Sequence, residues 1–307
     1  MQAVNDKPSV AVIGLGEMGS ALGRALLKDG YIVKGWNRSP PKVAALVATG
    51  ALPASSLIEA LTTCEVVVVC VANHAAVVDL LHGPAASAAL KGKTLIQMTS
   101  RTPAEARLRE LWSRKNGVRA LEGAIQSYPT HIGTPEGAIL YSGPRDVFDR
   151  MQALLRCLGG HAVFVGEQIG SSAALDMALA GTIVPGATLA FLQGAAICHA
   201  EGAPLAAFLD LAEHQVIPGL LLATLRSSIS MIERANYAYE GGAPIDTWLS
   251  GLASLNGAVE EAGVNPSWSQ SVFAYLRQAA ANGHGQCELA AVFEQFRANR
   301  SPPSKGE

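Results

Sequence analysis

Three glycines near the N-terminus have the spacing of a dinucleotide-binding turn. Gly14, Gly16 and Gly19 follow an apolar run at residues 10–13 and open a stretch of helical character. In such a motif the first glycine permits a tight turn, the second lets the backbone approach a pyrophosphate, and the third allows close helix packing. The helix N-terminus offers free N–H groups and its positive dipole end to the phosphates. We therefore predict cofactor contacts from Gly14, Leu15, Gly16, Glu17, Met18 and Gly19.

The end of the next predicted strand favours a phosphorylated cofactor. An NAD-specific protein normally offers Asp or Glu to the ribose hydroxyls at this point. This chain instead has Asn37, Arg38 and Ser39, followed by Lys42. A guanidinium pairs well with a phosphate, and the amide and hydroxyl groups add hydrogen bonds. The pattern predicts NADPH as the cofactor; the alternative is that Arg38 is an ordinary solvated loop residue.

Two further predicted strands end in residues that suit a ligand site. The first ends in Val71, Ala72 and Asn73, and the second in Thr99 and Ser100. The carboxyl ends of parallel strands meet at the edge of the sheet where such proteins bind ligands. We expect these five residues to approach the nicotinamide ribose or the substrate.

A bound nicotinamide exchanges a hydride, so the protein must orient or protonate the substrate. The chain has no Tyr-x-x-x-Lys pair, no His-Glu-x-x-His motif and no Cys/His cluster with metal-ligand spacing. We therefore predict no metal site. Lysine is also absent between Lys115 and Lys305, which removes the commonest cationic partner for an acid substrate.

The composition restricts the class of protein. The chain has 307 residues, of which 49% are hydrophobic and 16% charged, with a net charge of −2. This content excludes a disordered chain, and the lack of a basic block argues against a nucleic-acid partner. Five scattered cysteines suggest reduced thiols in a cytoplasmic protein, and no signal peptide is expected at the polar N-terminus.

The alternation of β-rich and helix-like runs in the first half predicts a parallel sheet covered by helices on both faces. After Gly166 the chain becomes rich in Ala and Leu and helical. We predict an α/β protein with an N-terminal Rossmann domain over residues 1–166, then a long inter-domain helix and an all-α domain over 167–307. The expected strands are 10–13, 31–36, 66–71, 94–98, 118–124, 138–141 and 162–165. The expected helices are 18–29, 41–49, 75–81, 103–115, one starting near Pro144, and 171–200, 204–214, 219–234, 245–262, 268–281 and 286–297.

One segment could be mistaken for a membrane span. Residues 177–200 contain no Asp, Glu, Lys or Arg and are long enough to cross a bilayer. Gly181, Pro185 and Gly186 interrupt the segment, and no basic flank follows it. We expect a buried helix and no membrane contact.

The glycine motif, the Trp-Asn-Arg-Ser run at 36–39, and the blocks at 122–136 (Glu-Gly-Ala-Ile-Gln-Ser-Tyr-Pro-Thr-His-Ile-Gly-Thr-Pro-Glu) and 139–143 resemble the NADPH-dependent imine reductases. These belong to the 6-phosphogluconate and β-hydroxyacid dehydrogenase superfamily. The resemblance runs over nearly the whole chain. It implies a homodimer with reciprocally exchanged helical domains, in which each active site is shared between the two chains.

The resemblance also points to Asp176. Hydroxyacid dehydrogenases carry a catalytic lysine on the inter-domain helix, whereas imine reductases usually have Asp or Tyr, and counting along the helix places Asp176 there. A carboxyl group can stabilise an iminium cation or protonate the amine nitrogen as hydride reaches carbon. The alternative is that Asp176 merely complements the helix dipole. We predict that the substrate pocket is lined by Tyr128, Leu179, Ala180, Phe191 and Trp248. The alternative is that the aromatic residues among them only pack in the hydrophobic core.

The sequence thus favours NADPH-dependent reduction of cyclic imines or iminium ions to amines, with Asp176 as proton donor or iminium anchor. Two alternatives stay open. A β-hydroxyacid dehydrogenase is opposed by the missing lysine. A non-catalytic, NADPH-binding regulatory protein would bind the cofactor without turning over any imine.

Overall fold

The computed structural model describes residues 7–297, and these divide into two compact units. The first unit ends at Val184 and the second begins at Pro185. The predicted domain boundary near Gly166 lies 18 residues before the end of the first unit at Val184, and the boundary stays a prediction. The outer ends of the two predicted domains, residues 1–6 and 298–307, lie outside the described residues.

The first unit is built on one eight-stranded sheet within the described residues, with the strand order β3-β2-β1-β4-β5-β6-β7-β8. Neighbouring strands are parallel except β6 and β7, which are antiparallel, so the expectation of a uniformly parallel sheet is wrong at β7. The strands are β1 Val10–Ile13, β2 Val33–Trp36, β3 Leu52–Pro53, β4 Val66–Val69, β5 Thr94–Gln97, β6 Arg119–Ile125, β7 Ala138–Ser142 and β8 His161–Gly166.

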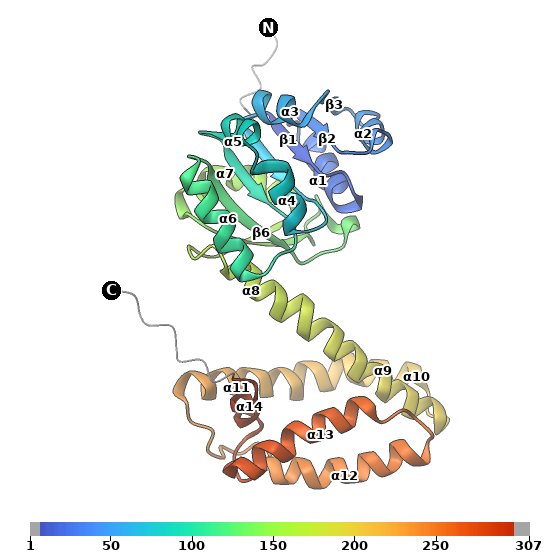
Figure 1. Ribbon diagram of the computed structural model, residues 1–307. Coiled ribbons are helices and arrows are strands. Elements are labelled where there is room, and N and C mark those ends of the chain that lie inside the picture. The colour runs from blue at the N-terminus through green and yellow to red at the C-terminus, as the bar shows by residue number, and fades with distance from the viewer. Residues whose placement is uncertain (1–6, 298–307) are drawn as a thin grey trace. The chain divides into compact units, whose positions relative to one another are not determined.

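Helices cover both faces of this sheet (Figure 1), which explains why the central strands lack hydrophobic alternation. Val10 and Val12 pack into one core with residues of α1 and α7, whereas Ala11 and Ile13 pack into a second core with residues of α3, α4 and α5. The helices of this unit are α1 Glu17–Lys28, α2 Pro40–Val47, α3 Leu57–Thr63, α4 His74–Leu81, α5 Pro84–Leu90, α6 Pro103–Lys115, α7 Arg145–Leu158 and α8 Ser171–Ala178.

The sequence did not predict β3, α3 or α5. Each of the two helices has only seven residues, and β3 has two, so none is long enough for a legible hydrophobic period. The positions of the other strands and helices of this unit are confirmed to within about three residues. The α/β class and the Rossmann-like arrangement are therefore confirmed.

The second unit is helical. Its α-helices are α9 Val184–Ala200, which begins at the last residue of the first unit, α10 Leu205–Leu211, α11 Leu222–Arg234, α12 Ile245–Glu261, α13 Ser267–Ala279 and α14 Phe293–Phe296. The expected break before Gly219 is wrong, because a π-helical segment, Ala212–Leu221, joins α10 to α11 and contains Pro218. The expected helix at 286–297 is also wrong, since a 3₁₀ turn, Leu289–Val292, precedes the one-turn α14.

The second unit buries little of its apolar surface. Among its described residues, Ile245, Leu276, Ala279 and Ala291 form one small core cluster, and Met231, Val259, Phe273 and Ala290 are also buried. Two helical stretches, Ser171–Ala200 and Leu205–Arg234, have mean hydropathies of 1.6 and 1.3 and pass the length and composition test for a membrane span. Only 6% and 0% of these two windows are buried within the chain, so the expectation of a buried helix at residues 177–200 is wrong for a single chain. Length and composition alone are weak evidence for a membrane span.

Candidate active site

The glycine turn between β1 and α1 has the geometry that a dinucleotide requires. Gly14 has φ of +92°, and a Cβ there would overlap the carbonyl oxygen of Cys70. A Cβ at Gly19 would overlap the carbonyl oxygen of Gly14, so the third glycine lets α1 start close to the sheet. Gly16 instead faces open space, because a Cβ there would meet no atom within 4 Å. These residues fit a pyrophosphate resting on the N-terminus of α1.

The residues after β2 lie beside this turn. Asn37 accepts a hydrogen bond from the Leu15 N–H through Oδ1 at 3.1 Å, so it fixes the glycine loop directly. Arg38 is exposed and lines a cavity of about 710 Å³ together with Trp36 and Asn37. Lys42 lines a neighbouring cavity of about 870 Å³ with Leu15, Gly16, Glu17 and Tyr128. Ser39 precedes α2 and accepts a hydrogen bond from Asn37 Nδ2 through its carbonyl oxygen at 3.4 Å.

The ends of β4 and β5 are tied to each other. Thr99 is buried, and its Oγ1 accepts a hydrogen bond from the Val71 N–H at 3.0 Å. Asn73 caps α4, because its Oδ1 accepts a hydrogen bond from the Ala76 N–H at 3.0 Å. Ala72 and Ser100 are exposed beside these two contacts. Thr99 and Asn73 therefore hold the loops in place, which leaves Ser100 as the hydroxyl open to a ligand.

A cavity of about 530 Å³ brings several predicted residues together. Met18, Val71, Ser100, Asp176 and Ala180 all line it, so cofactor-side and substrate-side residues meet in one place within the first unit. The remaining lining residues, which the sequence did not single out, are Cys70, Met98, Arg101, Gly123, Ala124, Ile125, Met177 and Gly181.

The other residues predicted for the pocket are not among those that line this cavity of the first unit. Tyr128 lines the neighbouring cavity beside the glycine turn. Leu179 is exposed in the π-helical turn Leu179–Ile183 and is not part of the cavity wall. In the second unit, Phe191 packs on Phe208 with ring centroids 4.8 Å apart, and Trp248 packs against the small core of that unit.

Asp176 is held in the cavity wall by a residue that the sequence did not indicate. Its side chain lies on α8 and is 9% exposed, and its Oδ1 accepts a hydrogen bond from Gln126 Nε2 at 2.7 Å. Gln126 directly follows β6, at the ligand-binding edge of the sheet. That position and its place in the block at 122–136 were the available signals, and neither singles out Gln126 as a partner of Asp176.

A buried charge network lies behind Asp176. Glu122 of β6 pairs with Arg101 Nε at 2.7 Å and with Arg109 Nη1 at 3.4 Å. Burial raises the pKa of the Glu122 carboxyl to about 7, and the two guanidinium groups oppose that rise. Arg101 Nη2 also donates to Ser172 Oγ at 2.6 Å. Ser172 lies one turn before Asp176, so the network anchors the start of α8 to the sheet.

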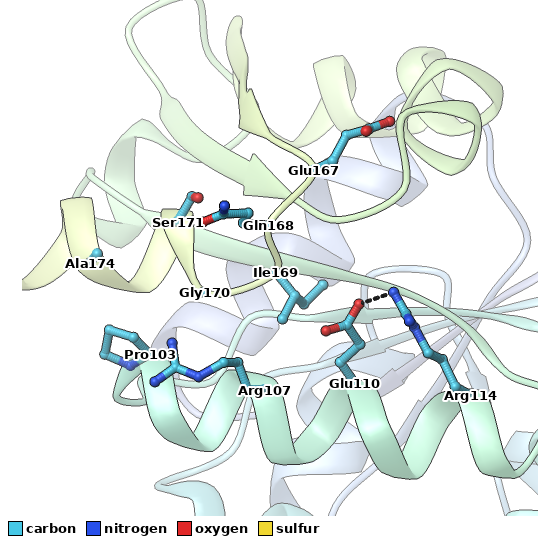
Figure 2. Close-up of a pocket in the computed structure, with 10 residues that line it drawn as sticks. All are labelled: Pro103, Arg107, Glu110, Arg114, Glu167, Gln168, Ile169, Gly170, Ser171 and Ala174. Carbon is cyan, nitrogen blue, oxygen red and sulfur yellow. Dashed lines mark hydrogen bonds and ion pairs between the residues drawn. The ribbon is translucent and has the colours of Figure 1, made fainter. Parts of the chain in front are cut away.

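Figure 2 shows a different cavity, of about 490 Å³, between α6 and the residues that lead into α8. Arg107, Glu110 and Gln168 are among its lining residues, and an ion pair of 2.6 Å joins Glu110 to Arg114. No residue that the sequence singled out for chemistry lines it. Among residues 7–297, no group of three His, Cys, Asp or Glu side chains is placed to hold a metal ion.

Comparison with known proteins gives consistent matches over both units. Residues 9–166 match the family model for the NAD-binding domain of 6-phosphogluconate dehydrogenase, and residues 168–298 match the model for the C-terminal domain of NADPH-dependent reductive aminase-like proteins. The NADPH-dependent reductive aminase of Aspergillus oryzae is 30% identical over 95% of this chain and 98% of its own length.

Solved structures show the same relationship. The imine reductase of Myxococcus stipitatus in complex with NADP⁺ is 32% identical and superposes with a TM-score of 0.85, over 94% of this chain and all of that one. The reductive aminase of Aspergillus terreus in complex with NADPH and ethyl levulinate is 27% identical, with a TM-score of 0.84 over 95% of this chain and all of that one.

Proposed function

The chain belongs to the family of NADPH-dependent imine reductases and reductive aminases, oxidoreductases that act on C=N bonds, and we propose that it reduces cyclic imines and iminium ions with Asp176 as the group that contacts nitrogen. The observation that carries this proposal is the 530 Å³ cavity, where Asp176 lines the same wall as Ser100 and the end of β4. No lysine is present in that wall.

The chain's own residues divide the work as follows. Bound NADPH supplies the hydride that adds to the imine carbon. The Gly14–Gly19 turn and α1 hold the pyrophosphate, and Arg38, Ser39 and Lys42 hold the ribose phosphate, the feature that separates NADPH from NADH. Asp176 stabilises the positive charge of the iminium group as a carboxylate, or delivers the proton to the amine nitrogen as the neutral acid. The side chains of Met98, Ile125 and Met177 give part of the cavity an apolar lining.

We further propose that two chains form a homodimer with exchanged helical domains, so that the partner's helices complete the substrate pocket. The exposed apolar side chains of the second unit support this, including Leu189, Leu192, Leu220 and Ile229, each more than half exposed. A second copy of the same surface would cover them. A cytoplasmic location is also proposed, and the five unpaired cysteines are consistent with it.

A panel assay tests the reaction. NADPH absorbance is followed with five-, six- and seven-membered cyclic imines, and 3-hydroxy acids with NADP⁺ are run beside them. We expect turnover of imines and none of the hydroxy acids. If the protein oxidises a 3-hydroxy acid and reduces no imine, the proposed function is wrong and the protein is a β-hydroxyacid dehydrogenase. NADPH binding without any turnover would favour a regulatory protein.

A further inference from the structure

One side chain beside Asp176 has no role in the reaction described so far. Gln126 donates from Nε2 to Asp176 Oδ1 at 2.7 Å, although the two residues are 50 positions apart and lie on different elements. An amide that donates a hydrogen bond to one carboxyl oxygen fixes the orientation of the carboxyl group. It also determines which of the two oxygens can carry a proton.

Gln126 is itself fixed by the sheet. Its backbone N–H donates to the carbonyl oxygen of Ala138 at 2.9 Å. The next residue, Ser127, accepts a hydrogen bond from the Ala138 N–H through Oγ at 2.8 Å. The backbone contact extends the pairing of β6 with β7 to Gln126, and the Ser127 side chain ties the next residue to Ala138, so the glutamine side chain starts from a fixed backbone.

Asp176 is fixed from the other side. Ser172, one turn earlier on α8, accepts from Arg101 Nη2 at 2.6 Å and donates to the carbonyl oxygen of Glu122 at 3.3 Å. The Ser172 N–H donates to Ser142 Oγ at 3.2 Å. The first turn of α8 is therefore bound to β6, to the end of β7 and to the loop that follows β5, and the contact between Gln126 and Asp176 is set before any ligand binds.

We propose that Gln126 is a positioning residue that holds Asp176 Oδ1 and thereby assigns Oδ2 to the substrate nitrogen. No described residue donates a hydrogen bond to Oδ2. Because Oδ1 already accepts the amide hydrogen, the proton of the neutral acid belongs on Oδ2. As hydride adds to the imine carbon, the Oδ2–H bond breaks, an N–H bond forms, and Asp176 is left as a carboxylate that the amide still stabilises. The inference rests on the proposed role of Asp176.

Substitution of Gln126 tests this directly. Gln126→Leu removes the donor, and we expect kcat for a cyclic imine to fall roughly 10- to 100-fold, since hydrogen bonds to charged groups are worth that much. The KM for imine and the Kd for NADPH should change by less than about threefold, because binding contacts remain. In an Asp176→Ala background, Gln126→Leu should have no further effect on kcat.

Gln126→Glu gives a readout that a purely structural role would not move. At pH 8 two carboxylates would face each other, and activity should fall at least as far as in Gln126→Leu. As the pH drops toward 6, one carboxyl takes a proton and can donate again, so the ratio of variant to wild-type kcat should rise. Gln168→Glu, an exposed glutamine outside this cavity (Figure 2), is the matched control and should keep a flat ratio.

Other ionisable groups near the cavity do not mimic this result. Burial raises the pKa of the Cys70 thiol to about 11, above the range of the test. Burial raises the pKa of Glu122 to about 7, but that titration is common to variant and wild type and cancels in the ratio.

The outcomes are distinguishable. A kcat for Gln126→Leu within threefold of wild type, or an equal loss in the Asp176→Ala background, would overturn the inference. A flat ratio for Gln126→Glu would do the same. If Asp176→Ala itself keeps full turnover, the proposed function of Asp176 fails instead, whatever the Gln126 variants do.

Discussion

The two units of the chain differ in how much of their apolar surface is buried within the chain. In the first unit the central strands are buried on both faces by helices of the same chain. The residues that could take part in catalysis gather at one edge of that sheet. In the second unit the described residues form one small core cluster around Ile245 and Leu276, while many leucines and isoleucines are exposed. The exposed apolar side chains of the second unit are the basis of the proposed dimer.

The strongest test of this contrast places charges on the exposed apolar surface of the second unit. In the double variant Leu192→Glu with Ile229→Glu, two carboxylates would enter the proposed dimer interface. Losing two apolar contacts and burying two charges should weaken dimerisation by about 5 kcal/mol or more, roughly a thousandfold or greater. Analytical ultracentrifugation should show a monomer with little imine reductase activity.

The matched control is Leu108→Glu with Leu111→Glu on α6 of the first unit. These leucines are 57% and 64% exposed, comparable to the 55% and 58% of Leu192 and Ile229. The control should stay a dimer with full activity. If both double variants remain dimeric, or if the wild type is recovered only with membranes, the exchanged-dimer proposal is wrong.

The next largest effect concerns the charge network of the first unit. Arg101→Met leaves Glu122 buried without its nearest cation, and we expect unfolding free energy at pH 8 to fall by about 3–5 kcal/mol. Arg114→Met removes a surface pair in which the arginine is 74% exposed, and should change it by less than about 1 kcal/mol. Urea unfolding of both variants measures the difference.

The same variant has a defined pH dependence. Burial raises the pKa of Glu122 from 4.5 in the unfolded chain to about 7 in the fold. Its favourable contribution is therefore present below about pH 4.5 and is lost as the pH rises to about 7. Removing Arg101 raises that pKa further, so the stability deficit of Arg101→Met should grow from pH 5 to pH 8. A deficit that shrinks with rising pH would contradict this.

Cofactor choice is expected to depend on an exposed residue. Arg38→Ala should raise the KM for NADPH by roughly 10- to 100-fold, because it removes a charge-assisted contact to the ribose phosphate. The KM for NADH should change by less than about threefold. Steady-state kinetics with both cofactors measures this, and equal effects on the two would remove Arg38 from phosphate recognition.

The smallest expected effect concerns the N-terminal caps of the helices, which differ between the two units. Thr102 caps α6 in a capping box with Glu105, whereas α10, α12 and α13 of the second unit follow prolines and have no side-chain cap. Thr102→Ala should cost about 1 kcal/mol of unfolding free energy. The measurement is thermal unfolding, with Ser271→Ala on α13 as a control that should be near neutral.

The sequence predicted what depends on local patterns. The bounds of α6 are as predicted, because Thr102, Pro103 and Glu105 are strong start signals. The glycine turn was predicted correctly for the same reason, because its glycines have a fixed spacing. The cofactor assignment followed from residues whose types and spacing suit a phosphorylated dinucleotide, whereas the family assignment followed from the resemblance of longer sequence blocks.

Long-range contacts and irregular helices were not predictable. Gln126 contacts Asp176 only because the fold brings β6 and α8 together. Nothing in the local sequence distinguishes Glu122 from an exposed carboxylate on a strand, although it forms a buried ion pair. Pro218 normally ends a helix, but the π-helical register around it removes the need for its missing N–H. Leu179, Phe191 and Trp248 have pocket-like identities, yet their surroundings depend on packing that no local pattern encodes.

The most direct test of the central claim is the turnover of a cyclic imine by Asp176→Ala, measured with NADPH binding in the same preparation. We predict that kcat falls by at least about 100-fold, the usual contribution of a positioned acid, while the Kd for NADPH and the melting temperature stay near their wild-type values. A variant that reduces the imine at the wild-type rate would contradict the account.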